Sequence, residues 1–396
     1  MDTLSFPAFA GPHVCRPLLR SSVRLALVIL LVAGCGGSSP KGGAMPPPNQ
    51  PAATPSIATS PAQNGAVIVT LSDTTANAVM HYTVDGSAPT SSSPQYFAPF
   101  LVAANLTVNA VATAPPLLTS AAATRTFSPN LASGTLVWSD EFANTGSSNI
   151  GPSTTVWTYD TGTDCCGNNE LETYCAYGSS TPPCSTGSPN AYIGTDGYLH
   201  IEALSPSPGV YTSARLKSQG LFTFQYGRIE ARMQLPESQG MWPAFWMLGS
   251  NITAVPWPAC GEADIMEHID GANPPFSAGG VPPGYDWIAG SVHGGASTST
   301  EVNGSQRFNP AAFSAAAWHT YGMIWSKGQI QFYVDDPSNI YATFNTSNFG
   351  GTWPFDQGPM FIILNLAVGG DWPGNPDSTT AFPSNMLVDY VRIYTN

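Results

Sequence analysis

The chain has 396 residues, enough for two domains with additional segments, and carries 25 Asp and Glu against 12 Lys and Arg, a formal charge of −13. Such an acidic surface repels nucleic acid and sulfated polysaccharides, so a neutral polymer fits better as a partner. The 39 glycines, the 37 prolines and an aromatic content of 11% are typical of a loop-rich β protein.

Residues 1–34 have the pattern of an export signal. Three arginines, at 16, 20 and 24, precede the apolar run from Leu25 to Val32, which is too short to span a bilayer. The run ends in Val32-Ala33-Gly34-Cys35, which resembles a bacterial lipobox and predicts lipidation of Cys35. We therefore expect an extracytoplasmic protein, anchored by lipid in the bacterial cell envelope. The alternative is a soluble secretory signal with a coincidental cysteine.

Residues 35–54 are rich in Gly, Ser, Pro and Ala and cannot bury a core, which predicts a tether. Residues 55–128 then read as a small β module, with strands at Val67–Leu71 and His81–Val84. The run from Tyr82 to Tyr96 resembles the small C-terminal-type module of chitobiases and hexosaminidases. We expect this module to be a spacer, with sugar binding as the alternative.

A larger domain is expected over residues 134–396. Its clearest strand pattern lies at Tyr226–Leu235, where apolar residues alternate with Arg228, Glu230, Arg232 and Gln234, so that one face is buried and the other wet. Leu136–Phe142 opens the domain, and similar patterns occur at Tyr198–Leu204, Gln329–Asp335 and Met386–Tyr394. No convincing amphipathic helix is present. The pattern predicts an all-β fold, a sandwich of two sheets.

The cysteines favour an oxidising compartment. Because the adjacent Cys165 and Cys166 rarely bond each other, we expect two bridges from them to Cys175 and Cys184, in either connectivity. Cys260 is left over, and we expect a buried thiol there. No cysteine pair has the spacing of a zinc site.

Three carboxylates crowd one predicted strand, in a chain where only 9% of residues are charged. Glu262 and Asp264 share a face, because side chains alternate along a strand. Glu267 reaches the same face only if a β-bulge within Ile265–Met266 inserts one extra residue. Retaining glycoside hydrolysis needs two carboxyl groups roughly 5–5.5 Å apart, and mutual repulsion keeps one of them protonated. A calcium loop or an ordinary acidic strand edge is the alternative.

Further runs flank this strand in a fixed order: Gly240–Gly249 (GMWPAFWMLG), Trp257-Pro258, Ser291–His293 and Phe361–Gly374 (FIILNLAVGGDWPG). From about Leu136 to Tyr394 the chain resembles glycoside hydrolase family 16, in particular its laminarinase-type endo-β-1,3-glucanases. The resemblance implies a concanavalin A-like β-jelly roll with a concave sheet that holds β-glucan. It also implies that the chain acts as a monomer and needs no cofactor for catalysis.

The resemblance assigns roles to individual residues. Glu262 is the expected nucleophile, Glu267 the general acid/base and Asp264 the residue that tunes both. His293 is expected in the cleft, with a core histidine as the alternative. The expected sugar-binding residues are two polar ones, Asn169 and Arg215, and four stacking platforms, of which at least one is expected to be core: Trp242, Trp246, Trp257 and Trp372.

Glu141 and Asp389 lie in the first and last strands of the large domain and are candidates for a structural calcium site, as in some relatives. The alternative is a surface salt bridge. Two other functions stay open, namely a non-catalytic β-glucan recognition protein on the same fold and a hydrolase of another β-glucan or galactan. The three carboxylates favour an enzyme over the recognition protein, and the acidic surface disfavours agarase or carrageenase activity.

Overall fold

The computed structural model describes residues 50–163, 167–269 and 286–396. The regular secondary structure of these residues is almost entirely β-strand, and a single-turn 3-10 helix, η1 (Thr298–Thr300), is the only helical element in them. Within the same residues, no helix is long and apolar enough to cross a membrane. The signal, Cys35 and nearly all of the tether lie outside the described residues. The chain is all-β, as predicted.

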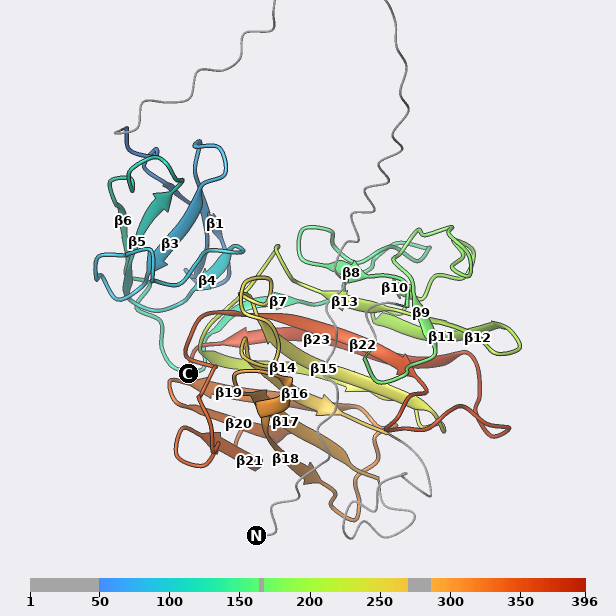
Figure 1. Ribbon diagram of the computed structural model, residues 1–396. Coiled ribbons are helices and arrows are strands. Elements are labelled where there is room, and N and C mark those ends of the chain that lie inside the picture. Colours follow the sequence, from blue (N-terminus) through green and yellow to red (C-terminus); the bar gives the residue numbers. More distant parts are fainter. Residues whose placement is uncertain (1–49, 164–166, 270–285) are drawn as a thin grey trace, which may run out of the picture.

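The small module packs two three-stranded sheets against each other (Figure 1). One sheet has the order β1-β2-β4 and the other β3-β5-β6. Its strands are β1 (Ser56–Pro61), β2 (Val67–Ser72), β3 (Val79–Thr83), β4 (Phe100–Val102), β5 (Leu106–Thr113) and β6 (Ala123–Phe127). Its core contains Val69, Tyr82, Phe100 and Val108, with the rings of Tyr82 and Phe100 stacked at 5.0 Å. The two strands expected from the sequence correspond to β2 and β3.

The module is docked onto the large domain, which contradicts the spacer prediction. The backbone N–H of Leu101 in β4 donates to the carbonyl of Thr223, and the Thr223 N–H donates to Pro99, both at 2.9 Å. On another side, Gln63 Nε2 donates to Ser139 Oγ at 2.9 Å. Ala66 is 2% exposed and belongs to the core of the large domain. A module joined by a shared core and by hydrogen bonds is part of the same body.

The large domain is a sandwich of two sheets. In the described residues one sheet has ten strands, ordered β21-β20-β19-β14-β23-β11-β12-β9, with β10 beside β11 and β7 beside β23. Its strands are β7 (Leu136–Asp140), β9 (Glu172–Tyr174), β10 (Ala191–Ile193), β11 (Leu199–Ser207), β12 (Val210–Ser213), β14 (Gly227–Gln234), β19 (His319–Ser326), β20 (Gln329–Val334), β21 (Ile340–Asn345) and β23 (Ser384–Tyr394).

The second sheet has seven strands, in the order β18-β17-β16-β15-β22-β13-β8. These strands are β8 (Thr158–Asp160), β13 (Arg215–Lys217), β15 (Met241–Gly249), β16 (Glu262–Glu267), β17 (Ile288–Gly294), β18 (Val302–Phe308) and β22 (Met360–Val368). One contiguous core fills the space between the sheets, with Ile229 and Met323 from one sheet and Phe245 and Leu364 from the other. The motif-bearing strands β15, β16 and β22 lie side by side in the middle of this sheet.

Strand β14 follows the predicted alternation, with one exception. Ile229, Ala231 and Met233 are fully buried, as expected. Glu230, expected on the wet face, is only 6% exposed. It pairs with Arg228 and accepts hydrogen bonds from two tyrosine hydroxyls, one of them on Tyr333 at 2.6 Å. A buried carboxylate is tolerated here because every side of it is paired.

The cysteine prediction was wrong in its pairing. Cys175 is bonded to Cys184, nine residues away, instead of each bonding one of the adjacent cysteines. Cys165 and Cys166 lie outside the described residues. Cys260 is a buried thiol, as predicted, and burial raises its pKa to about 12. Such a thiol stays protonated and unreactive at neutral pH.

Candidate active site

The three carboxylates of β16 face one cleft, because the strand carries the predicted bulge. Phe245 of β15 pairs with Met266 and the next residue, Trp246, pairs with Asp264, so Ile265 is the extra residue. Ile265 and Met266 both point into the core between the sheets. The insertion therefore returns Glu267 to the side of Glu262 and Asp264, and all three line the same cleft.

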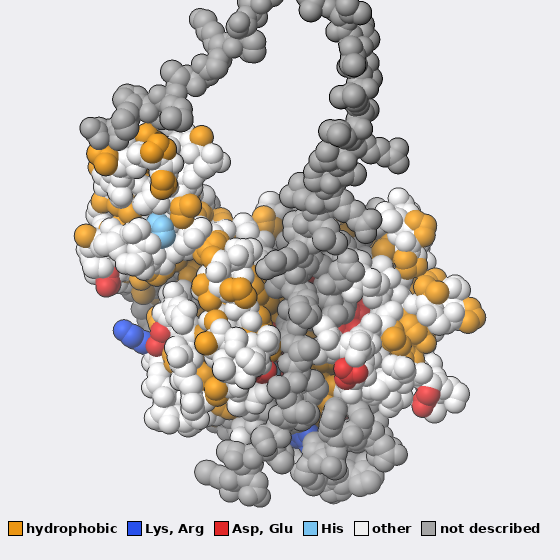
Figure 2. Space-filling view, in the orientation of Figure 1, with side chains coloured by type: hydrophobic (Ala, Val, Ile, Leu, Met, Phe, Trp, Pro, Cys, Tyr) orange, Lys and Arg blue, Asp and Glu red, His pale blue; other side chains and the backbone are white. Residues whose placement is uncertain are grey.

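The floor and walls of this cleft come from neighbouring strands and one loop. Its lining consists of Asn168, Glu170, Tyr174, Arg215, Trp242, Ala244, Trp246, Glu262, Asp264, Glu267, Asn365 and Ala367. Of the residues predicted from the sequence, the cleft brings together the three acids, Arg215, Trp242 and Trp246. On the face of the molecule in Figure 2, charged side chains are sparse, which suits an uncharged ligand.

His293 of β17 lies beside the acids, opposite Glu262 in the strand register. Its Nε2 is 3.1 Å from Oδ2 of Asp264 and 4.0 Å from Oε1 of Glu262. On the other side of the ring, Nδ1 is 2.7 Å from Oε1 of Glu301, whose side chain is 2% exposed. Burial alone would lower the pKa of His293, but the hydrogen bonds with Asp264 and Glu301 outweigh burial and raise that pKa well above its usual value. Each ring nitrogen faces a carboxylate oxygen, an arrangement that favours the doubly protonated, cationic form of His293.

The same burial acts on the carboxyl groups in the opposite direction. It raises the pKa of Glu267 to about 8, with a further contribution from the charge of Asp264. Burial and the charge of Asp264 raise the pKa of Glu262 well above its ordinary value, although the positive charges of His293 and Arg215 oppose that rise. For Asp264, burial raises the pKa and the hydrogen bond with His293 counteracts it. The cluster therefore holds at least one proton near neutral pH.

Two tryptophans of the cleft are fixed by hydrogen bonds, and Trp242 is the one that contacts a reacting group. Trp242 Nε1 donates to Oε1 of Glu267 at 3.0 Å. Trp246 Nε1 donates to Oδ1 of Asn365 at 2.7 Å, and the guanidinium of Arg215 lies over the Trp246 ring at 4.5 Å. Arg215 is itself fixed by Asp160, with its Nε 3.2 Å from the carboxylate. Both indoles are thus held in one orientation at the cleft.

The other two tryptophans do not line the cleft. Trp372 is 6% exposed and packs edge-on against Trp242 at 5.2 Å, inside a small aromatic cluster with Trp287. It is the core tryptophan that was expected among the four. Trp257 is half-buried, 6.2 Å from the ring of His293. Asn169 also stays outside the lining, and its amide donates to Asp371 at 3.0 Å. Its neighbours Asn168 and Glu170 are the ones that reach the cleft.

Five polar residues of the site were missed in the sequence: Asn168, Glu170, Tyr174, Asn365 and Glu301. Asn365 lies inside the run Phe361–Gly374 and has a usable signal, because it is a lone amide in the otherwise apolar strand β22. No sequence pattern singles out Tyr174, yet its hydroxyl accepts a hydrogen bond from Asn365 Nδ2 at 3.2 Å. Glu301 follows a stretch of Ser and Thr with no motif.

Two places in the described residues offer possible metal ligands. Glu262, Asp264 and His293 offer ligand atoms within 4.8 Å of one another, but the raised pKa of His293 favours a protonated ring, which competes with metal binding. Glu141 accepts two hydrogen bonds from Arg392, at 2.8 and 3.0 Å, and Asp389 pairs with Arg232 at 2.6 Å. Each carboxylate is thus engaged by an arginine, which fits the salt-bridge alternative better than calcium.

Comparison with known proteins agrees with this geometry. The family model of glycosyl hydrolases family 16 matches residues 183–392, and that of the chitobiase/beta-hexosaminidase C-terminal domain matches residues 59–124. A beta-glucanase of Rhodothermus marinus is 38% identical over 272 residues, which are 65% of this chain and 84% of that protein. A keratan-sulfate endo-1,4-beta-galactosidase of Sphingobacterium multivorum is 33% identical, over 65% of this chain and 54% of that protein.

A solved structure is similar as well. The laminarinase catalytic domain from Thermotoga maritima MSB8 is 33% identical and matches with a TM-score of 0.54, over 67% of this chain and 99% of that one. The family match extends over more than half of the 396 residues and contains the whole of β16. With its acids on one face of a jelly-roll sheet, this chain belongs to glycosyl hydrolases family 16.

Proposed function

We propose that the protein is a retaining endo-β-1,3-glucanase in which Glu262 is the nucleophile and Glu267 the general acid/base. The observation that carries the proposal is the bulge at Ile265, which brings both glutamates and Asp264 to one cleft. The beta-glucanase and laminarinase relatives support a β-glucan as the substrate. The galactosidase relative is named for a sulfated substrate, which the formal charge of −13 disfavours here.

The proposed reaction has two steps. In the first, a Glu262 oxygen attacks the anomeric carbon while Glu267 gives its proton to the glycosidic oxygen, so the bond to the leaving sugar breaks and a glycosyl ester forms. In the second, Glu267 takes a proton from water, whose oxygen attacks the same carbon and releases Glu262. Two inversions leave a β-configured product.

The charges of the cleft fit these roles. The raised pKa of Glu267 keeps its proton available at neutral pH, as a general acid requires. Glu262 must be ionised to attack; burial raises its pKa well above the ordinary value, and the nearby cations His293 and Arg215 counteract that rise. Asp264 forms an ion pair with His293 at 3.1 Å, and the same ring nitrogen lies 4.0 Å from Glu262. Trp242 donates to Glu267 and stabilises the carboxylate that exists after proton transfer.

The test compares two variants and the stereochemistry of the wild type. Proton NMR should show the β-anomer as first product from laminarin. Glu262→Ala should lose hydrolysis but join sugars when supplied with an α-glycosyl fluoride, which imitates the intermediate. Glu267→Ala should slow hydrolysis of laminarin by roughly 10²–10⁴-fold, and azide should intercept its glycosyl enzyme as a β-azide.

Glu141→Gln, a carboxylate outside the cleft, is the matched control and should keep the wild-type rate. An α-anomer as the first product contradicts the retaining mechanism, and exchanged phenotypes of the two variants reverse the roles. Laminarin, curdlan, lichenan and agarose digested side by side test the substrate. Binding of laminarin without cleavage by the wild type would favour a recognition protein.

We also propose that the chain acts outside the cytoplasm, held at the envelope by a lipid on Cys35, and that it works as a monomer. The support is the Val32–Cys35 sequence after an apolar run. Cys35→Ser should move the protein from the membrane fraction to the soluble fraction. Unchanged fractionation would contradict the lipid anchor.

A further inference from the structure

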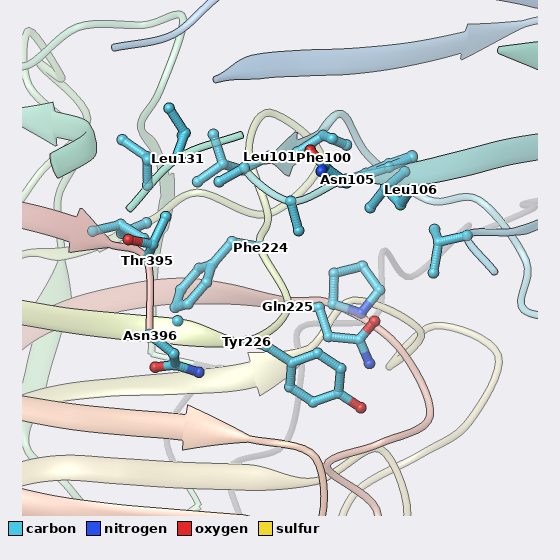
Figure 3. A pocket seen from close by; sticks show the side chains of 18 of the residues that line it. Phe100, Leu101, Asn105, Leu106, Leu131, Phe224, Gln225, Tyr226, Thr395 and Asn396 are labelled. Atoms are coloured by element: carbon cyan, nitrogen blue, oxygen red, sulfur yellow. The ribbon is translucent and has the colours of Figure 1, made fainter. Parts of the chain in front are cut away.

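A second cleft lies where the small module meets the sandwich, and it shares no residue with the catalytic one. Its volume is about 450 Å³, within the range of roughly 300–1,000 Å³ that small-molecule sites occupy, often at domain interfaces. Figure 3 shows Asn105 and Leu106 of the module on one side and Gln225 and Tyr226 of the sandwich on the other. Both walls are fixed relative to each other, because β4 is hydrogen-bonded to Thr223.

No charged side chain lines this cleft. Its side chains are aliphatic, aromatic or amide, with one hydroxyl at Thr395, and none of them belongs to Asp, Glu, Lys or Arg. In a chain of net charge −13, a cleft without charged side chains selects against ions of either sign. What fits is a neutral molecule with apolar faces and hydrogen-bonding groups around its edge.

Tyr226 supplies a rigid aromatic surface at this cleft. Its backbone has φ 61°, a left-handed conformation that a bulky residue rarely adopts, so its position is imposed by the surroundings. The ring stands edge-on to Trp325 at 5.3 Å, and its hydroxyl donates to Oδ1 of Asp356 at 3.2 Å. The ring is half-buried, so one part of it stays available to a ligand.

Gln225 lies beside this ring, and further amides line the same cleft. Gln225 is its neighbour in the chain and also lines the cleft, with its Nε2 directed to the carbonyl of Asp356 at 3.4 Å. Asn105 and Asn396 are exposed at the rim. Asn105 is held by two hydrogen bonds with Asn130, at 2.7 and 3.1 Å, and Asn396 donates to the carbonyl of Trp325 at 2.8 Å. A fixed aromatic face with amides beside it is the chemistry that recognises a sugar ring, whose C–H face stacks while its hydroxyls pair.

We propose that this cleft is a non-catalytic binding site for a neutral β-glucan chain, built jointly by the module and the sandwich. The choice of β-glucan among neutral sugars rests on the proposed substrate of the catalytic cleft. The site keeps the enzyme on its polymer between cuts, so it matters for insoluble glucan and little for short soluble oligosaccharides.

The test counts binding sites in the full chain carrying Glu267→Gln, which should not consume the ligand. Isothermal titration with laminarihexaose should give two sites per chain. Adding Tyr226→Asn removes the ring but keeps the backbone, because asparagine tolerates positive φ. It should weaken the second site about tenfold or more, the loss expected for one aromatic contact. Ala104→Phe, which fills the cleft from the module side, should do the same.

Tyr177→Ala, an exposed tyrosine elsewhere on the large domain, is the matched control and should keep both sites. In the otherwise wild-type chain, Tyr226→Asn should slow release of sugar from insoluble curdlan several-fold and leave cleavage of laminarihexaose unchanged. One site in every variant overturns the proposal, and so does binding of chitohexaose in place of laminarihexaose at the second site. Failure of the wild type to cut any β-1,3-glucan would instead refute the proposed function, whatever the number of sites.

Discussion

Oε1 of Glu301 lies 2.7 Å from Nδ1 of His293, on the side of the ring that faces away from the three acids of β16. Glu301 comes from the loop before β18 and is almost completely buried. A buried carboxylate in this place fixes both the orientation and the charge of the histidine. Glu301 is thus a positioning residue that acts on Glu262 and Asp264 through His293.

We expect Glu301→Gln to lower kcat/KM by about tenfold, the loss of one hydrogen bond between charged groups. Because the pKa of His293 should fall, the alkaline limb of the kcat/KM profile should also move to lower pH. Asp335→Asn is the matched control, since Asp335 forms the corresponding pair with a histidine outside the cleft, His319, at 2.9 Å. A Glu301→Gln profile that superimposes on the wild type would show that the contact is structural only.

Trp242→Phe should raise the pKa of Glu267 and so shift the alkaline limb in the opposite direction to Glu301→Gln. The indole N–H lowers the pKa of that carboxyl by donating to it, so its removal should raise the pKa further and shift the alkaline limb to higher pH. The lost hydrogen bond should slow hydrolysis about three- to tenfold at pH 7. Trp318→Phe, outside the cleft, serves as control. A rate change without a shift of the limb would indicate that Trp242 acts by stacking alone.

The buried acid/base should make the protein less stable as pH rises. The pKa of Glu267 is about 8 in the folded state against 4.5 ordinarily, so the unfolded chain releases this proton first and stability falls between these two values. Glu267→Gln should therefore raise Tm by about 2–4 °C or more at pH 8.5 and change it little at pH 4.5. Calorimetry at both pH values checks this. An equal change of Tm at both pH values would mean that ionisation of the buried Glu267 does not destabilise the fold.

The docked module should stabilise the sandwich. Deleting residues 36–128 removes the hydrogen bonds to Thr223 and Ser139 and uncovers the surface beneath Ala66, so Tm should fall by several degrees. Hydrolysis of soluble oligosaccharides at low temperature should persist, since no residue of the module lines the catalytic cleft. Ala66→Glu should reproduce the fall in Tm in the intact chain, whereas Ala58→Glu, on an exposed strand face, should not. An unchanged Tm after truncation would restore the spacer interpretation.

The sequence was most informative where one local pattern decides the structure. The alternation along β14 and the spacing of Glu262, Asp264 and Glu267 indicate directly which side of the sheet each side chain faces. Even the bulge at Ile265 follows from the need to keep the three acids on one side. The family resemblance added the order in which the motif-bearing strands follow one another. The local patterns and the resemblance each describe single segments, not the contacts between them.

What could not be predicted depends on which segments meet in space. The Cys175–Cys184 bond, the docking of Ala66 and the contact of Glu301 with His293 each join segments by tertiary packing, and no periodicity records them. Trp372 and Trp242 have the same residue type and adjacent motifs, yet only the packing decides that Trp372 is core and Trp242 contacts Glu267. Glu230 shows the converse, a charge buried because tyrosines from two other strands converge on it.

The bulge at Ile265 has a consequence for how such a strand can vary. Both residues beside the irregularity, Ile265 and Met266, point into the core, so loss of one of them would leave a regular strand whose three acids still face the cleft. Loss of one residue at this place is thus neutral for the polarity of each face. A single codon lost here would remove the bulge while the three acids stay at the cleft and the core keeps an apolar side chain.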